Sequence, residues 1–138
     1  ESNADTYCYL YNWYAVDDSR NIAPAGWHVA TDAEWTTLTD YLGGTSVAGG
    51  KMKETGTSHW NSPNTGATNE SGFTAFPGGY RYYYNGFYGS IGSYGYFWSS
   101  SENNSYDAWR RILNYNNSEV DRYNNDKKNG FSVRCVRD

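Results

Sequence analysis

The apolar side chains of this sequence are aromatic rather than aliphatic, and this feature most constrains how the chain can fold. Leu, Ile, Val and Phe account for only 18 of 138 residues, about 13%, below the roughly 20% under which disorder becomes a reasonable expectation. Six Trp and fifteen Tyr accompany the five Phe, and a Tyr or Trp side chain buries about 150–250 Å² while keeping a polar group hydrogen-bonded. We therefore expect a folded chain with an aromatic core.

Length and charge exclude several classes of protein. The 138 residues fit a single domain, residues 1–138, and the formal net charge is −4. No stretch approaches the ~20 apolar residues of a membrane span, so we expect no direct membrane insertion. The acidic balance and the lack of a basic cluster, with Lys127-Lys128 as the nearest approach, argue against nucleic acid as a partner.

The two cysteines, Cys8 and Cys135, lie near opposite ends of the chain. They form no CxxC pair and have no histidine at metal-ligand spacing, so we expect no metal site. Two alternatives remain open for them. They form a disulfide, worth about 4–5 kcal/mol by the loop-entropy estimate, or they are buried free thiols.

One helix is clear in the sequence, over about residues 32–42. Thr31 and Glu34 have the spacing of a capping box at its start. Trp35, Leu38 and Leu42 form one apolar stripe, and Gly43-Gly44 favours an end to the helix. A second short helix is predicted at residues 51–54.

The remaining elements are predicted to be strands and loops. Residues 7–16 are dense in aromatic side chains and predict a strand, and alternating residues at 131–136 predict another, so these two are expected to pair. Residues 55–79 predict a long ordered loop held by Trp60, Phe73 and Phe76. Short strands are expected over residues 80–99, and a hairpin joins 108–115 to 118–123 around Asn116-Asn117. The predicted fold class is α+β.

Six motifs in order carry a resemblance to a known family. They are Gly26-Trp27-His28-Val29, Thr31-Asp32-Ala33-Glu34-Trp35, Thr68-Asn69-Glu70-Ser71-Gly72-Phe73, Pro77-Gly78-Gly79-Tyr80-Arg81, Phe97-Trp98-Ser99-Ser100 and Gly130-Phe131-Ser132-Val133-Arg134-Cys135-Val136. Over residues 9–138 the chain resembles the Fibrobacter succinogenes major paralogous domain, of the formylglycine-generating-enzyme branch.

The resemblance implies a C-type-lectin-like fold with paired terminal strands, one or two helices and long irregular loops that present a binding face. Some members of this lectin-like class are variable proteins of diversity-generating retroelements, in which template adenines are randomised near the 3′ end of the gene. The chain departs from the family pattern at Ala23 and Ala30, where many members have Cys and Pro. Cys135 therefore lacks the partner that the family pattern implies.

The segment 103–126 contains two interleaved groups of residues. A framework group includes the apolar positions: Ala108, Trp109, Arg111, Leu113, Tyr115, Val120 and Arg122. Ligand-binding candidates make up the other group: Tyr106, Asp107, Arg110, Ile112, Asn116, Asn117, Glu119, Asp121, Tyr123, Asn124, Asn125 and Asp126. The residue types in this group, except that of Glu119, can all be reached from an AAC codon by changing only its adenines.

Alternation along a strand predicts that positions 110, 112, 119, 121 and 123 project from one face, opposite the framework. Asn and Tyr are residues that binding loops favour. Four further tyrosines, Tyr82, Tyr83, Tyr84 and Tyr88, are candidates for the rim of this face, although core packing is expected for at least half of them.

Catalytic chemistry is not expected. His28 lies in a framework motif and is expected to be structural, whereas His59 has no evident carboxylate partner. With Cys135 in a framework strand, the paired cysteines of formylglycine-generating enzymes are not expected here. Ser62-Pro63-Asn64 lacks the acid of a calcium-lectin loop, so we expect no metal and no cofactor.

The hypothesis is a non-enzymatic recognition domain that binds a protein or glycan ligand on another surface. It is expected to be extracellular, on a bacterial cell surface or a phage tail, within a longer protein. The alternative is a calcium-independent glycan-binding module of a surface protein.

Overall fold

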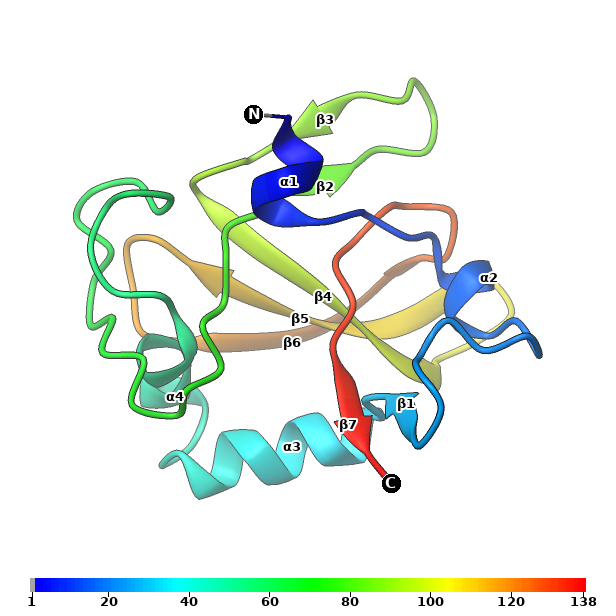
Figure 1. Ribbon diagram of the computed structural model, residues 1–138, viewed down its shortest axis with the longest axis horizontal. Helices are drawn as coiled ribbons and strands as arrows, with labels where there is room; N and C mark the ends of the chain where they lie inside the picture. Colours follow the sequence, from blue (N-terminus) through cyan, green and yellow to red (C-terminus); the bar gives the residue numbers. More distant parts are fainter. Residues whose placement is uncertain (1) are drawn as a thin grey trace.

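The computed structural model describes residues 2–138 and has the predicted α+β architecture (Figure 1). A central antiparallel sheet has the order β4(Tyr94–Glu102), β5(Asp107–Asn114) and β6(Val120–Asp126). Two smaller antiparallel pairs flank it, β1(Trp27–Val29) with β7(Cys135–Arg137) and β2(Tyr80–Arg81) with β3(Tyr88–Gly89). Within residues 2–138, no helix is both long and apolar enough to cross a lipid bilayer.

Both faces of the central sheet carry core residues, which accounts for the high aromatic content. Phe97, Leu113 and Val120 pack on the side of the sheet that faces the two longer helices. Trp98 and Ala108 belong to a second cluster on the other side, together with Phe131. Because successive strand residues point to opposite faces, a sheet covered on both sides needs bulky residues at consecutive positions. Phe97-Trp98 supplies them.

The predicted helix is confirmed as α3(Asp32–Tyr41). The hydroxyl of Thr31 accepts a 3.1 Å hydrogen bond from the amide of Glu34, whose carboxylate accepts one of 2.8 Å from the amide of Thr31, so the capping box forms as expected. Gly43 follows the helix with φ +105°, a backbone conformation that residues other than glycine rarely adopt.

A second helix, α4(Thr45–Met52), begins six residues before the predicted one. Sequence propensity misses its start, because Gly49 and Gly50 are poor helix formers. Both glycines are required by close packing, since a Cβ at Gly49 would lie 2.1 Å from the carbonyl oxygen of Glu119. Tertiary contact thus stabilises a helix that propensity alone does not predict.

The prediction of a strand at residues 7–16 is wrong. The structure has two short helices there, α1(Asn3–Tyr7) and α2(Trp13–Val16), and α2 is capped by Asn12, whose side chain accepts a 3.0 Å hydrogen bond from Ala15. Only Tyr11 pairs in strand fashion, through an isolated bridge to Phe131. The main partner of the C-terminal strand is instead β1, with His28 opposite Val136.

The long loop at residues 55–79 and its aromatic anchors are confirmed. Trp60 is buried and its indole N–H donates a 2.9 Å hydrogen bond to the carbonyl of Ala75. Phe73 packs against Trp35 and Phe97, with ring centroids 5.6 and 5.7 Å away. These contacts order a segment that has no helix or longer strand of its own.

Candidate binding surface

The predicted hairpin forms, and it brings five candidate residues to one face of the central sheet. Arg110 lies opposite Tyr123, Ile112 opposite Asp121, and Ala108 opposite Asn125 in the β5–β6 register. Since paired residues share a face, the following side chains form a group that we name the β5–β6 face: Arg110, Ile112, Asp121, Tyr123 and Asn125. This face lies opposite Leu113 and Val120, as predicted.

Arg110 lies at the centre of this face and is only 7% exposed. Its Nε donates a 2.7 Å hydrogen bond to Oδ1 of Asn125, and its Nη1 donates one of 3.0 Å to Oδ2 of Asp121. The guanidinium also lies 5.7 Å from the ring of Tyr123 and 5.9 Å from that of Tyr96. Arg110 therefore lies on the predicted face, but its neighbours on that face cover it.

Asp121 and Tyr123 remain exposed beside Arg110, and Tyr123 is 61% exposed. Burial raises the pKa of the Tyr96 phenol next to them, with the charge of Arg110 opposing this. The β5–β6 face therefore combines an open aromatic ring and an open carboxylate with a fixed cation.

Four other candidates lie at the end of the hairpin that is remote from its turn. Tyr106 is 76% exposed, and Asp107 pairs in register with Asp126. Asn124 points to the framework face, because its register partner is Trp109. The loop before β5 is held by Asn104, whose Oδ1 accepts hydrogen bonds from the amides of Tyr106 and Asp107.

The three remaining candidates, Asn116, Asn117 and Glu119, lie at the turn. Glu119 is exposed, precedes β6 and packs its carbonyl on Gly49, so the β5–β6 register does not extend to it. β5 ends at Asn114, so Asn116 and Asn117 lie beyond the strand, apart from the centre of the β5–β6 face.

The turn is held from within by a buried lysine that the sequence did not single out. Lys53 is fully buried, and its Nζ donates hydrogen bonds of 2.8–2.9 Å to the carbonyls of Thr65, Asn114 and Asn117. Burial lowers its pKa to about 8. The backbone at the turn is thus fixed by a group outside the hairpin.

On the opposite face, framework residues tie the hairpin to α3. Arg111 and Arg122 both hydrogen-bond the carboxylate of Asp32, at 2.6 and 2.8 Å, and Arg122 lies 3.6 Å from the ring of Trp109. Burial disfavours the charge of Asp32, but the bonds from Arg122 and Arg111 hold the pKa of its carboxyl below the usual range.

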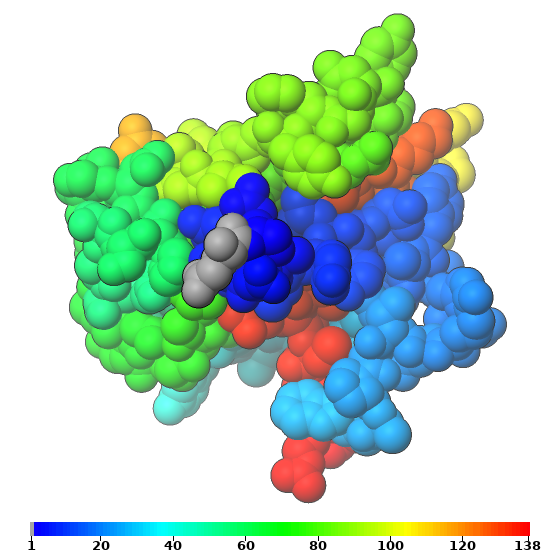
Figure 2. All heavy atoms as spheres, turned by 45° about the horizontal axis from the view of Figure 1, so that its top comes forward, coloured from blue at the N-terminus to red at the C-terminus, as the bar shows by residue number. Residues whose placement is uncertain are grey.

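The tyrosines at 82–88 are all exposed, so the expectation that half of them pack in the core is wrong. Tyr82, Tyr83, Tyr84 and Tyr88 are 41, 38, 81 and 61% exposed. They lie in the β2–β3 hairpin, which Figure 2 shows projecting beyond the rest of the surface. The Asn85-Gly86 pair is a strong hairpin signal that could have located them.

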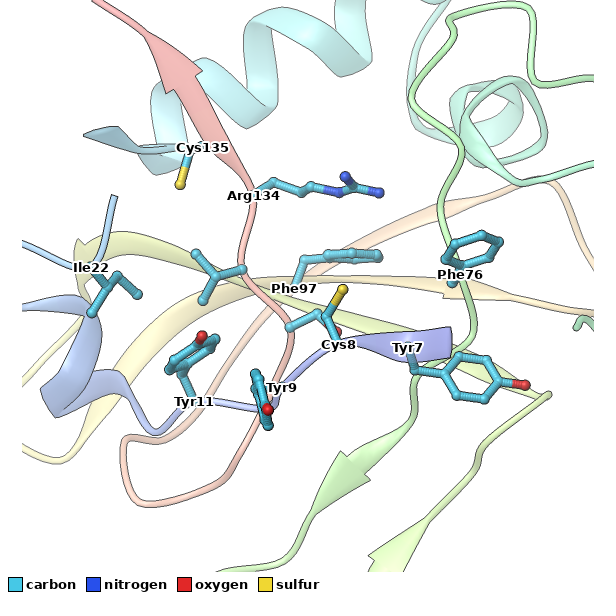
Figure 3. A pocket seen from close by; sticks show the side chains of 11 residues that line it. Tyr7, Cys8, Tyr9, Tyr11, Ile22, Phe76, Phe97, Arg134 and Cys135 are labelled. Atoms are coloured by element: carbon cyan, nitrogen blue, oxygen red, sulfur yellow. The ribbon is translucent and has the colours of Figure 1, made fainter. Parts of the chain in front are cut away.

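Both cysteines are free thiols, and they line one cavity of about 290 Å³ (Figure 3). Of the two alternatives, the free thiols are found, but the expectation that both are buried is wrong, because Cys8 is exposed and Cys135 is half-buried. Figure 3 shows Arg134 and Phe97 beside them. The lining of this cavity includes no histidine and no carboxylate, and burial raises the pKa of the Cys135 thiol, against the effect of Arg134.

Each histidine has carboxylate partners. His28 hydrogen-bonds Asp138 at 2.7 Å and Glu34 at 2.8 Å, so both of its ring nitrogens have a carboxylate partner. His59 lies 2.8 Å from Glu54, so the prediction that it lacks a carboxylate partner is wrong. In residues 2–138 no group of three or more His, Cys, Asp or Glu side chains could hold a metal ion.

Comparison with known proteins gives one match. The model of the family described as Fibrobacter succinogenes major domain matches residues 1–137. No curated protein and no solved structure matches the chain.

Proposed function

The chain belongs to the Fibrobacter succinogenes major domain family, and on that premise we propose that it is a non-enzymatic recognition domain. Its β5–β6 hairpin presents a binding surface, diversified by a retroelement, to a protein or glycan on another surface. The C-type-lectin-like fold, an extracellular position on a bacterial surface or phage tail, and a longer parent protein are parts of the same proposal.

The observation that carries the proposal is the division of the hairpin into two faces. Leu113 and Val120 are buried against the helices, whereas Asp121 and Tyr123 on the other face are exposed. Substitution at the exposed positions leaves the packing on the helices untouched. A surface that a retroelement rewrites needs this separation.

Rigid presentation is the proposed mechanism. The backbone of β5 is held by pairing with both β4 and β6, and the Asp32 contacts with Arg111 and Arg122 hold the hairpin on α3. A ligand that meets a fixed backbone and Tyr side chains with few rotatable bonds loses less free energy to ordering on binding.

The cavity lined by Cys8 and Cys135 supports the non-enzymatic part of the proposal. Nucleophilic catalysis by a cysteine needs a neighbouring base or a lowered thiol pKa. The cavity offers no base, and the pKa of Cys135 is raised instead.

Population sequencing of the 3′ end of the gene tests the proposal. We expect a nearby template copy and a reverse transcriptase gene, with variation confined to template adenines and affecting positions such as Asp121 and Tyr123. Codons for Leu113 and Val120 serve as matched controls and stay invariant. An invariant 3′ end with no copy would refute diversification.

A further inference from the structure

The β2–β3 hairpin forms a second exposed surface, remote in sequence from the proposed variable segment. We name its five outward rings the aromatic hairpin: Tyr82, Tyr83, Tyr84, Phe87 and Tyr88. Each is at least 38% exposed, and Tyr84 is 81% exposed. Burying such rings is a main source of binding free energy at interfaces.

The rings are ordered by one another and by the backbone. Tyr83 contacts Tyr82 and Tyr84 edge to face, with centroids 5.3 and 6.5 Å away. The amide of Tyr82 donates a 2.7 Å hydrogen bond to the carbonyl of Phe87, and that of Tyr83 donates one of 3.2 Å to Asn129. The surface is therefore preorganised for a ligand.

Two cations lie on these rings. The guanidinium of Arg81 is 5.9 Å from the ring of Tyr88, and Nζ of Lys128 is 5.4 Å from the ring of Tyr83. Both residues are exposed, and neither forms an ion pair in the part of the chain that the structure describes. Two of the five rings, Tyr88 and Tyr83, thus have a positive charge beside them.

The local charge is opposite to that of the whole chain. Between Gly72 and Ser101, Arg81 is the only charged side chain, although the net charge of the protein is −4. Two carboxylates occur in nearby segments, and each accepts a hydrogen bond from a neighbouring backbone amide. Asp126 accepts one from the amide of Lys128, and Asp5 accepts one from the amide of Ser2. The aromatic hairpin is a positive, aromatic area on an acidic protein.

A hollow of about 380 Å³ lies at the base of the hairpin, beside α1. Its lining includes Tyr7, Tyr9, Tyr88 and Ile91, and Tyr9 is 68% exposed. Figure 1 shows β2 and β3 next to α1 in the same view. The hollow extends the ring-lined area beyond the hairpin itself.

We propose that the aromatic hairpin binds an anionic glycan composed of uronic acids, independently of the β5–β6 face. A uronic acid offers a pyranose face for an aromatic ring and a carboxylate for a cation. The pairs Tyr88 with Arg81 and Tyr83 with Lys128 provide both partners together. Tyr hydroxyls and the amide of Asn85 supply hydrogen bonds to sugar hydroxyls.

Calorimetric titration of the intact protein tests this proposal. The probes are alginate and polygalacturonate, both uronic acid polymers, with dextran as the neutral glycan and poly-L-glutamate as the acidic peptide, all in EDTA. We expect binding to the uronic acid polymers that weakens with salt, and none to dextran. Absence of binding to both uronic acid polymers, or equally strong binding to poly-L-glutamate, overturns the proposal.

Variants locate the site. Arg81→Gln with Lys128→Gln, and separately Tyr84→Ala with Tyr88→Ala, should weaken binding about tenfold or more. The controls are Arg20→Gln and Tyr41→Ala, which remove an exposed cation and an exposed ring elsewhere. Unchanged binding in both hairpin variants overturns the proposal. Asp121→Ala should bind these polymers normally, so failure here is distinct from failure of the proposed function.

Discussion

Arg111 donates a 2.6 Å hydrogen bond from Nη1 to Oδ1 of Asp32, and this contact joins the middle of β5 to the first turn of α3. The side chain of Arg111 is 2% exposed. A buried cation of this kind depends on its partner, since the interior offers no water to solvate it.

Asp32→Asn should therefore destabilise the fold strongly. It leaves Arg111 buried without a counter-charge, which costs about 3–5 kcal/mol, and urea unfolding measures this loss. The control is Asp18→Asn, which breaks the exposed pair with Arg20 and should leave the unfolding midpoint unchanged. Similar midpoints for wild type and Asp32→Asn would show that the contact contributes little.

Lys53 gives the stability a distinctive pH dependence. Burial lowers its pKa from 10.5 to about 8, so between these values the unfolded chain binds more protons than the folded chain. Stability from this group therefore rises as the pH increases through that window. The variant Lys53→Met has no titrating group at this position. Relative to it, the free energy of unfolding of wild type should increase by about 2 kcal/mol between about pH 7.5 and about pH 10. A pH-independent difference between the two proteins contradicts this prediction.

His28 has the opposite behaviour. Hydrogen bonds with Asp138 and Glu34 raise its pKa above the ordinary 6.5. Its stabilising contribution is complete below 6.5 and is lost as the pH rises through the raised pKa. The Tm difference between wild type and His28→Gln should be larger at about pH 5.5 than at about pH 9. Equal differences at the two values exclude a charged His28 as the stabilising form.

Elements with a strong local signal were predictable from the sequence. The capping box at Thr31 and Glu34 fixed the start of α3, and alternation around Asn116-Asn117 located the β5–β6 hairpin. The capping contacts lie three residues apart, and the hairpin pairs segments joined by one short turn, from Leu113 with Val120 to Asp107 with Asp126. The family membership was likewise visible in six short motifs.

Elements that depend on distant contacts were not predictable. Residues 7–16 are aromatic because they cover the sheet, and not because they form a strand. The indole N–H of Trp13, for example, donates a hydrogen bond to the carbonyl of Ser99. Burial of Arg110 depends on Tyr96 and Tyr123 from two neighbouring strands, which the alternation of one strand does not show. The fully buried Lys53 is satisfied by carbonyls 12, 61 and 64 residues away.

Gly49 provides a test in which packing opposes propensity. In an ordinary helix, Gly→Ala stabilises by about 0.5–1 kcal/mol. In α4 the new Cβ would lie 2.1 Å from the carbonyl oxygen of Glu119, so Gly49→Ala should instead lower stability by about 1–3 kcal/mol. The control is Ser46→Ala on the exposed side of the same helix. Stabilisation by Gly49→Ala would mean that α4 does not pack on the hairpin turn.

The β5–β6 face makes its own prediction, because its members differ in burial. Tyr123→Ala removes an exposed side chain and should change the free energy of unfolding by about 0.5 kcal/mol or less, whereas Asp121→Ala leaves the buried guanidinium of Arg110 without its carboxylate partner and should cost about 1–3 kcal/mol. Arg110→Ala leaves the hydrogen-bonding groups of Asn125 and Asp121 without their partner and uncovers the ring of Tyr96, so a loss of about 1–3 kcal/mol is expected. Urea unfolding of the three variants separates the two classes. If Arg110→Ala unfolds at the wild-type midpoint, Arg110 is a dispensable surface residue, and the hairpin tolerates rewriting at this position as freely as at Tyr123.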